Sequence, residues 1–485
     1  MNQKSKILAF LLEFIMYICA NFLLKIMLQN IRLKRGLDIP IAGNAEPTIK
    51  KSIIPDIIAV KPTDFRCLTP KLTVKEGDAV KAGSIVFIDK KRPEIGFASP
   101  CSGTVQAIVR GEKRKLLAVL IKSDHEIQYV DFGKKDISRL SADQVRKNLL
   151  ESGLWAAIIQ RPYGIVANPA DTPKAIFISS FSTAPLAPDY NFTLKDETHN
   201  LQAGIDALKK LTKGNVVVGL RESDYATSPM YKLKDVVYYT FDGPHPAGNV
   251  GVQINHISPI SKGEIVWTID PVMLAAIGRL FNEGIYDTSK LVAITGMRAK
   301  ERCYVKTLPG ISMEQIAEFA SSEEVELYGT TSQIRYISGD ILTGENVGEK
   351  GYLGFYHNQI TLISEGNYRE CFGWAKPIRP KKFSLSKSYF SWLTPRKKYN
   401  MDTNLNGGQR AFVVTGLYEK VVPMDIYPVY LLKAILAEDI DKMEKLGIYE
   451  VIEEDFALCE YVCPSKIDVQ EIVSKGIDLM IKEMA

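Results

Sequence analysis

VKEGDAVKAGSIVFIDKKRPEIGFASPCSGTVQAIVRGEKRKLLAVLI, residues 74–121 of this 485-residue chain, is the stretch that best defines the fold of its N-terminal part. Gly77, Gly83 and Pro100 supply turns between short runs that are rich in β-branched residues. Runs of this length that alternate with turns are typical of small antiparallel sheets. We therefore predict a β-rich module over residues 31–130.

The same stretch resembles biotinyl- and lipoyl-type barrel-sandwich modules, in which a lysine on a hairpin carries the swinging cofactor arm. Lys90 or Lys91 occupies the position of that lysine. Attachment would require a lysine that stands clear at the hairpin tip, but here a second lysine and Arg92 crowd it. We expect a structural module that carries neither lipoyl nor biotin.

Residues 141–300 follow a different pattern, in which apolar strands alternate with helical stretches. We expect one helix at 200–214 and strands at 174–181, 215–220, 235–241, 264–269 and 290–296. This alternation predicts a Rossmann-like α/β domain with a largely parallel sheet, which binds ligands at the carboxyl ends of its strands. Neither the dinucleotide fingerprint G-x-G-x-x-G nor the phosphate loop G-x4-G-K-[ST] occurs in the chain.

A glycine-rich segment, FDGPHPAGNVGVQINHISP at residues 241–259, is the candidate ligand loop of this domain. Its glycines could let backbone approach an anion or a planar ring, whereas its prolines and the lack of a following lysine favour an irregular loop that packs on a neighbour. Both interpretations remain open. The candidate ligand residues are Gly243, His245, Gly248 and Gly251.

The C-terminal part contains the chain's only closely spaced cysteines, Cys459 and Cys463, in FALCEYVCPSKIDVQ. The bacterial ferredoxin run C-x2-C-x2-C-x3-C-P would place its two other ligands at Phe456 and Glu453, neither of which is a cysteine. The remaining cysteines and the histidines show no zinc spacing. We expect a degenerate cluster motif, no metal, and no tightly bound cofactor on this chain.

Charge is unevenly distributed along the chain, although the net charge of +5 is too small for general nucleic-acid binding. Residues 375–400 carry eight Lys or Arg, no acid, and several aromatic side chains. Such a stretch suits a surface that faces anionic lipid or an acidic partner, and the alternative is a solvated basic loop. The candidate docking residues are Lys381, Lys382, Trp392, Arg396, Lys397 and Lys398.

The first 30 residues form an apolar extension, ILAFLLEFIMYICANFLL at residues 7–24, interrupted by Glu13. Three explanations fit it: a start codon placed too far upstream, a membrane anchor, and a cleaved signal peptide. The expected organisation is a multidomain α/β plus α+β protein. After the α/β domain we expect a small β-grasp-like domain at 301–375, the basic aromatic segment with strands at 376–424, and a helical domain at 425–485.

In chain order, several long motifs resemble one bacterial family, the A subunits of Na+-translocating NADH:quinone oxidoreductases. The motifs are RGLDIPIAG (35–43), FASPCSGTV (97–105), GLWAAIIQRPYGIVANP (153–169), FDGPHPAGNVG (241–251), NGGQRAFVVTGLYEKVVPMDIYP (406–428) and FALCEYVCPSKIDVQ (456–470). The resemblance implies a peripheral subunit on the cytoplasmic side of the inner membrane, against the membrane-embedded B subunit. It further implies quinone as the substrate of the complex, NADH and flavins on other subunits, and no complete catalytic site here.

The resemblance also bears on the cysteine motif, because related subunits of respiratory complex I and of the Rnf-type complex keep clusters and a glycine-rich flavin loop. We therefore interpret Cys463 and Pro464 as the end of a helix packed by Phe456 and Leu458. The competing interpretation of the whole chain is a non-redox scaffold or small-ligand-binding protein on the same fold. The acids expected to be free for a partner are Glu453, Glu454 and Asp455.

Overall fold

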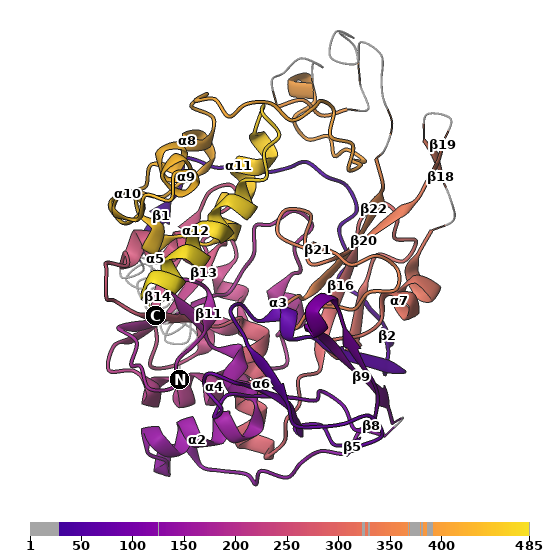
Figure 1. The fold of residues 1–485 in the computed structure, drawn as a ribbon, viewed down its shortest axis with the longest axis vertical. Helices are drawn as coiled ribbons and strands as arrows, with labels where there is room; N and C mark the ends of the chain where they lie inside the picture. The colour runs from indigo at the N-terminus through magenta and orange to yellow at the C-terminus, as the bar shows by residue number, and fades with distance from the viewer. Residues whose placement is uncertain are drawn as a thin grey trace, which may run out of the picture.

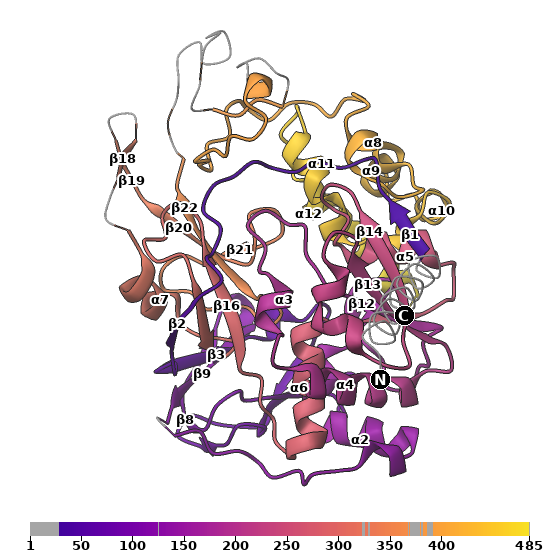
Figure 2. The same ribbon diagram turned by 180° about the vertical axis from the view of Figure 1, so that it is seen from behind.

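The computed structural model describes residues 29–124, 126–322, 325–327, 330–366, 368, 379, 382–385 and 391–484. The apolar run 7–24 and the docking candidate Lys381 lie outside these residues. The β-rich module lies at the lower end of the molecule and the helical C-terminal part at the upper end, with two sheets between them (Figures 1 and 2). The fold class expected from the sequence is confirmed.

The β-rich module consists of two small sheets, with strand orders β3-β9-β8-β5 and β4-β6-β7. Apolar side chains of both sheets, among them Val86, Phe97 and Val119, are fully or almost fully buried in one core. Gly77 and Gly83 have positive φ, as tight turns require. The strands are β3 (Ile57–Val60), β4 (Pro70–Leu72), β5 (Ala79–Val80), β6 (Ile85–Asp89), β7 (Gly96–Ala98), β8 (Gly103–Arg110) and β9 (Leu116–Ser123).

A seven-stranded sheet forms the centre of the α/β domain, in the order β1-β14-β13-β12-β15-β10-β11. The first five strands in this order are parallel, and β10 and β11 continue the sheet in antiparallel fashion. The strands are β1 (Gln29–Arg32), β10 (Ile159–Arg161), β11 (Ile165–Val166), β12 (Ala175–Ser179), β13 (Asn215–Arg221), β14 (Val237–Asp242) and β15 (Val266–Thr268).

Both faces of this sheet are covered, which explains why its central strands are continuously apolar. Ile176 and Ile178 pack with the apolar sides of helices α4 (Thr198–Leu211) and α6 (Pro271–Glu283). Phe177, on the opposite side of the pleat, packs with Ile254 of α5 (Val250–Ile257). The helix expected at 200–214 is therefore confirmed as α4.

A second, six-stranded sheet has the order β2-β17-β16-β22-β20-β21, and helix α7 (Met313–Ala320) contributes to its core. The run 290–296, which we expected in the α/β sheet, forms β16 of this second sheet instead. A short apolar run fits any buried strand, so its pattern could not identify its sheet. The strands are β2 (Ile49–Ser52), β16 (Lys290–Thr295), β17 (Tyr304–Thr307), β20 (Ile334–Ser338), β21 (Glu345–Asn346) and β22 (Gln359–Ser364).

The C-terminal part is helical and packs around one apolar core that includes Phe456, Leu458, Cys459 and Cys463. Helix α11 ends at Val462 with Cys463 as its C-cap, which agrees with the interpretation of Cys463 and Pro464 as the end of a helix. The α-helices of the C-terminal part are α8 (Tyr418–Val421), α9 (Pro428–Leu436), α10 (Ile440–Lys445), α11 (Ala457–Val462) and α12 (Val469–Met484). The remaining α-helices and strands of the described residues are α2 (Ala142–Ser152), α3 (Tyr190–Thr193) and the hairpin β18 (Val325–Leu327) with β19 (Thr330–Ser332).

Candidate functional site

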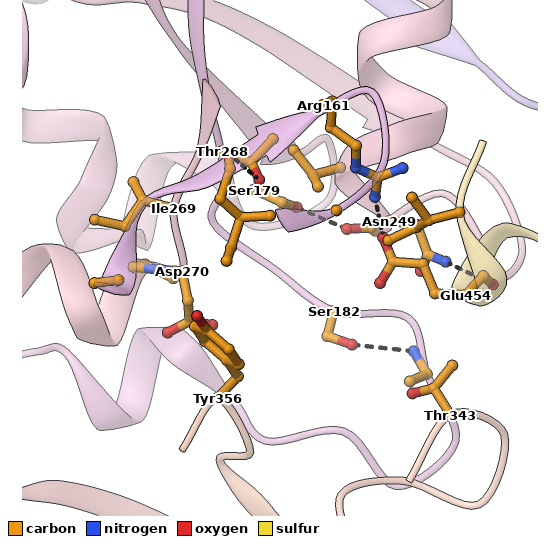
Figure 3. Close-up of a pocket in the computed structure, with 18 of the residues that line it drawn as sticks. Arg161, Ser179, Ser182, Asn249, Thr268, Ile269, Asp270, Thr343, Tyr356 and Glu454 are labelled. Atoms are coloured by element: carbon orange, nitrogen blue, oxygen red, sulfur yellow. Dashed lines mark hydrogen bonds and ion pairs between the residues drawn. The ribbon is translucent and has the colours of Figure 1, made fainter. Parts of the chain in front are cut away.

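The order of the parallel strands identifies where this sheet can bind a ligand. From β12, the chain adds β13 and then β14 towards one edge of the sheet. It then returns and places β15 on the other side of β12. A crevice opens outside the carboxyl ends of the strands where the order reverses in this way. A cavity of about 420 Å³ lies there, bordered by Ser179 at the end of β12 and Thr268 at the end of β15 (Figure 3).

One end of this switch-point cavity is built around Asp270, which caps the first turn of α6 by accepting a hydrogen bond from the Val272 amide. Its Oδ2 also accepts hydrogen bonds from Tyr190 (3.0 Å) and from the Asn358 amide (3.1 Å). Burial raises the pKa of Asp270. Tyr356 lies beside it (Figure 3), and this end therefore offers aromatic walls and polar groups whose hydrogen bonds are already made within the protein.

The opposite end is occupied by Arg161, the last residue of β10, whose side chain is only 2% exposed. Its Nη1 lies 3.0 Å from Asp455 Oδ2, and its Nη2 donates to Glu454 (Figure 3). Glu453 in turn pairs with Arg66 of the N-terminal module. The expectation that these three acids are free for a partner is wrong, because the buried guanidinium needs counter-ions and the C-terminal helical part supplies them.

This ion pair has an uneven charge balance, since two carboxylates face one guanidinium. Burial raises the pKa of Glu454 to about 7, Arg161 lowers it and the neighbouring Asp455 raises it again. Within the described part of the chain, Asp455 Oδ1 and Arg161 Nε have no hydrogen-bond partner. Glu454 is therefore a carboxyl group at the cavity wall that can exchange a proton near neutral pH.

The glycine-rich loop reaches the cavity only in part. His245 and Gly248 line it, but a Cβ at Gly243 would lie 2.6 Å from the Leu33 carbonyl oxygen, and one at Gly251 would lie 2.7 Å from Asp455 Oδ1. These two glycines therefore admit neighbouring protein groups, as the packed-loop interpretation requires. Ligand binding by the loop stays a prediction for His245 and Gly248.

His245 is held as a neutral imidazole in the cavity wall. Burial lowers its pKa to about 4, and its Nδ1 lies 3.1 Å from Thr183 Oγ1. Its backbone amide donates to Asp38 Oδ1 at 2.9 Å. The side chain can therefore serve as a hydrogen-bonding group of the cavity but not as a positive charge at neutral pH.

Sequence reasoning missed the residues that define the two ends of the cavity, Arg161 and Asp270. Arg161 lies two residues after the apolar run 154–159, and a charge so close to a buried run indicates a buried ion pair. Asp270 precedes Pro271, which is the sequence signature of a helix start after a strand. Their partners lie far away in the chain, and the sequence gives no sign of that pairing.

The cysteine pair is part of the apolar core. Burial raises the pKa of Cys459 well above its ordinary value, and Tyr418 donates a hydrogen bond to Cys463 Sγ at 3.0 Å. Phe456, at one of the ligand positions of the ferredoxin pattern, is fully buried beside them. Over the described residues, no group of three or more His, Cys, Asp or Glu side chains is arranged to hold a metal ion.

The docking candidates that the structure describes lie at the surface. Trp392 is 53% exposed, Lys397 lies over the ring of Tyr399 at 5.4 Å, and Lys398 donates to Asn44 at 2.6 Å. Lys382 approaches Tyr368 at 3.1 Å, and Arg396 is exposed.

Exposed apolar side chains gather in the same part of the chain. Nine of the fourteen large exposed hydrophobic side chains of the described residues fall between residues 385 and 436. We call the described residues 382–385 and 391–436 the apolar-basic segment, and they lie at the upper end of the molecule (Figures 1 and 2). The nine are Leu385, Trp392, Leu393, Leu405, Val413, Val414, Tyr427, Tyr430 and Leu436.

Within the described part of the chain, no helix combines the length and the apolar character needed to cross a lipid bilayer.

Comparison with known proteins gives a consistent result. Residues 31–124 match the family model of the NqrA N-terminal barrel-sandwich hybrid domain, and residues 140–286 match that of the NqrA second alpha/beta domain. Proteins named as the A subunit of the Na(+)-translocating NADH-quinone reductase, from Neisseria meningitidis serogroup A and Neisseria gonorrhoeae, are each 36% identical over 456 residues, which cover 93% of this chain and 100% of theirs. The equivalent protein of Yersinia pestis is 36% identical over 441 residues, 90% of this chain and 96% of its own.

Proposed function

Because the chain belongs to the A-subunit family of the Na(+)-translocating NADH-quinone reductases, we propose that it is a peripheral subunit supporting quinone reduction coupled to sodium export. Its membership confirms the family resemblance of the sequence motifs and makes the other subunits of that complex its partners. The proposed partner in direct contact is the membrane-embedded B subunit, on the cytoplasmic side of the membrane.

The observation that carries this proposal is the apolar-basic segment. Exposed aromatic and aliphatic side chains such as Trp392 and Tyr427 accompany Arg396 and Lys398, and the stretch 375–400 contains no acid. Protein interfaces are enriched in aromatic side chains and arginine, and cations near a membrane are attracted by its anionic lipids. The apolar side chains favour a protein partner over the lipid surface alone, because they can be buried only where a complementary surface covers them.

The switch-point cavity supports a role without a flavin of this chain's own. Arg161, the buried arginine at one end of the cavity, is already neutralised by Glu454 and Asp455. A phosphate would have to displace two carboxylates from a buried guanidinium. We accordingly assign NADH and the flavins to other subunits, with quinone as the substrate of the complex.

A charge-reversal experiment tests the docking role. Lys382, Lys397 and Lys398 are changed together to Glu in the full complex, with a matched control in which exposed Lys75, Lys81 and Lys115 of the N-terminal module are changed to Glu. We expect the first variant to lose co-purification with the membrane subunits and NADH-to-quinone turnover, because each cation near an anionic surface contributes about 1 kcal/mol. The control should assemble normally.

The possible outcomes distinguish a protein partner from the lipid surface. Assembly and turnover at the wild-type level in the first variant would refute the docking role. Normal assembly combined with loss of binding to phosphatidylserine vesicles would assign the segment to lipid and not to the B subunit. Rising salt should loosen wild-type attachment, since attraction between exposed charges is screened beyond about 8 Å at physiological ionic strength.

The assignment of cofactors has its own test. Metal analysis and intact-mass measurement of the purified chain should find no iron with acid-labile sulfide and no added mass on the hairpin of Lys90 and Lys91. Either finding would contradict the proposal.

A second candidate function, a non-redox scaffold or small-ligand-binding protein, is favoured by the switch-point cavity itself. Fractionation distinguishes the two. A free binding protein would stay in the soluble fraction, whereas a component of the reductase should be recovered with membranes alongside flavoprotein subunits.

A further inference from the structure

A second cavity, of about 260 Å³, lies beside the switch-point cavity at the carboxyl ends of β12 and β13. Phe181, Ser182 and Tyr190 line both cavities and form their common wall. The other polar residues that line the second cavity are Ser180, Asp189, Asn191, Arg221, Asp224 and Ser228. The two cavities together therefore extend across three successive strands of the sheet.

Arg221 is the main hydrogen-bond donor of the second cavity. It is the last residue of β13, its Nη2 donates to the Ser182 carbonyl oxygen at 2.8 Å, and its guanidinium lies over the Phe181 ring at 5.2 Å. Its Nε is buried and has no hydrogen-bond partner in the described part of the chain. The ring and the carbonyl fix the guanidinium in place, and donor capacity remains for a ligand.

Two carboxylates supply acceptors in the same cavity. Asp224 Oδ2 accepts a hydrogen bond from the side-chain Nδ2 of Asn191 at 3.3 Å. Asp189 Oδ1 accepts one from the backbone N–H of Asn191 at 2.9 Å. Burial raises the pKa of Asp224, while the positive charge of Arg221 lowers it. Arginine, two carboxylates and an amide thus border one small polar space, with the ring of Phe181 as its wall.

We propose that the second cavity binds the vicinal diol of a ribonucleoside, whose base would extend into the switch-point cavity. Each ribose hydroxyl can donate to a carboxylate such as Asp224 and accept from a guanidinium such as Arg221. In sheets of this type, the end of the strand that follows the first is where an acidic or arginine side chain meets the ribose. The aromatic side chains Phe181 and Tyr356 give the neighbouring cavity walls for a flat base.

Charge favours the uncharged part of a nucleotide over its phosphates. The second cavity has two aspartates for one arginine, and the two arginines that line the switch-point cavity, Arg66 and Arg161, are already paired with carboxylates. A phosphate in the second cavity would be repelled by its surplus of carboxylates. The ligand is therefore a ribonucleoside with any phosphate directed outward.

The site is tested by titrating the full chain calorimetrically with adenosine, 2′-deoxyadenosine and NADH. Adenosine should bind, and 2′-deoxyadenosine should bind at least about 10-fold more weakly, because it leaves buried polar groups without their partner. Arg221→Gln and Asp224→Asn should each weaken binding about 10-fold or more. Arg110→Gln, which removes an exposed cation of the N-terminal module, is the matched control and should bind as wild type.

Hydrogen exchange of the same complexes locates the ligand. Protection is expected at residues 180–191 and 221–228 and not at 103–110. NADH is assigned to other subunits and should bind no more tightly than adenosine, and tighter binding of NADH would contradict that assignment. The proposal is overturned if adenosine does not bind at about 1 mM, if the deoxy analogue binds equally well, or if the folded Arg221 and Asp224 variants both bind as the Arg110 variant does.

Discussion

The switch-point cavity and the apolar-basic segment both combine cations with aromatic side chains, yet they treat charge in opposite ways. Arg161 at the cavity is 2% exposed, and two carboxylates from the C-terminal helical part compensate it. In the apolar-basic segment, Arg396 and Lys398 are exposed, and they belong to the stretch 375–400, which contains no acid. Where the chain supplies the counter-charge, the ion pair joins two parts of the fold. Where it does not, the charged side chain can contact another molecule.

This difference has an energetic consequence. Removing one partner of a buried ion pair leaves an uncompensated charge and costs about 3–5 kcal/mol, whereas an exposed pair contributes little. Changes at the cavity should therefore act mainly on the free energy of unfolding. Changes in the apolar-basic segment should act mainly on assembly and should depend on salt.

The largest effect is expected for Arg161→Met, which keeps the volume and apolar stem of the side chain but removes its charge. Asp455 is 3% exposed and would lose its counter-ion, so the free energy of unfolding should fall by about 3–5 kcal/mol in urea titrations. Arg139→Met, which breaks an exposed pair with Asp136, is the control and should unfold as wild type. Equal midpoints for the two variants would remove the distinction between the regions.

A smaller loss is expected for Gly251→Ala. Alanine normally stabilises a helix relative to glycine, but here its Cβ would lie 2.7 Å from Asp455 Oδ1 and 2.9 Å from Arg161 Nη1. We expect a loss of about 1–3 kcal/mol from the displaced ion pair, measured by thermal unfolding. At Gly408 a Cβ would meet nothing within 4 Å, so Gly408→Ala should leave the midpoint unchanged. Stabilisation by Gly251→Ala would show that the ion pair can shift without lowering the free energy of unfolding.

Much of the fold could be predicted from the sequence, because its signals are local. Turn glycines such as Gly77 and Gly83, the apolar spacing of α4 and the apolar strands of the α/β sheet each reflect the conformation of neighbouring residues. The sheet to which β16 belongs is decided by contacts with β17 and β22, which lie further along the chain. A short apolar run carries no information on that choice.

The site was predicted less well than the fold, for the same reason. Its defining pair joins Arg161 to Asp455 across 294 residues of sequence. The acids at 453–455 read as a solvated face, since an acidic run usually is one, and only the buried arginine opposite them decides otherwise. Single-sequence patterns report the polarity of a segment, not the partner that compensates it.

The pH dependence of stability gives a third, smaller contrast. Burial raises the pKa of Glu454 from 4.5 to about 7, so the folded protein binds a proton there that the unfolded chain releases. Its ionised form therefore destabilises the fold above about pH 7, and this cost disappears as the pH falls toward the ordinary value. Because the side chain is partly exposed to the cavity, we expect an effect of only about 1 kcal/mol.

Glu454→Gln isolates this contribution, because glutamine imitates the protonated carboxyl and can still accept from Arg161. Wild-type protein should lose stability relative to the variant as the pH rises from about 5 to about 8, measured by urea unfolding at each pH. A difference between the two proteins that stays constant over this range would show that Glu454 does not titrate there.

The smallest effect on folding is expected at the other region, for Trp392→Ser. Trp392 is 53% exposed, so its replacement should change the free energy of unfolding by no more than about 0.5 kcal/mol. Exposed tryptophans that become buried in an interface contribute strongly to binding, and attachment to the membrane subunits should weaken about 10-fold, measured by co-purification over a salt series. Ile54→Ser, an exposed apolar position outside the segment, is the control for both measurements. Marked destabilisation together with normal attachment would mean that the apolar-basic segment, like the cavity, serves the chain's own fold and not its partner.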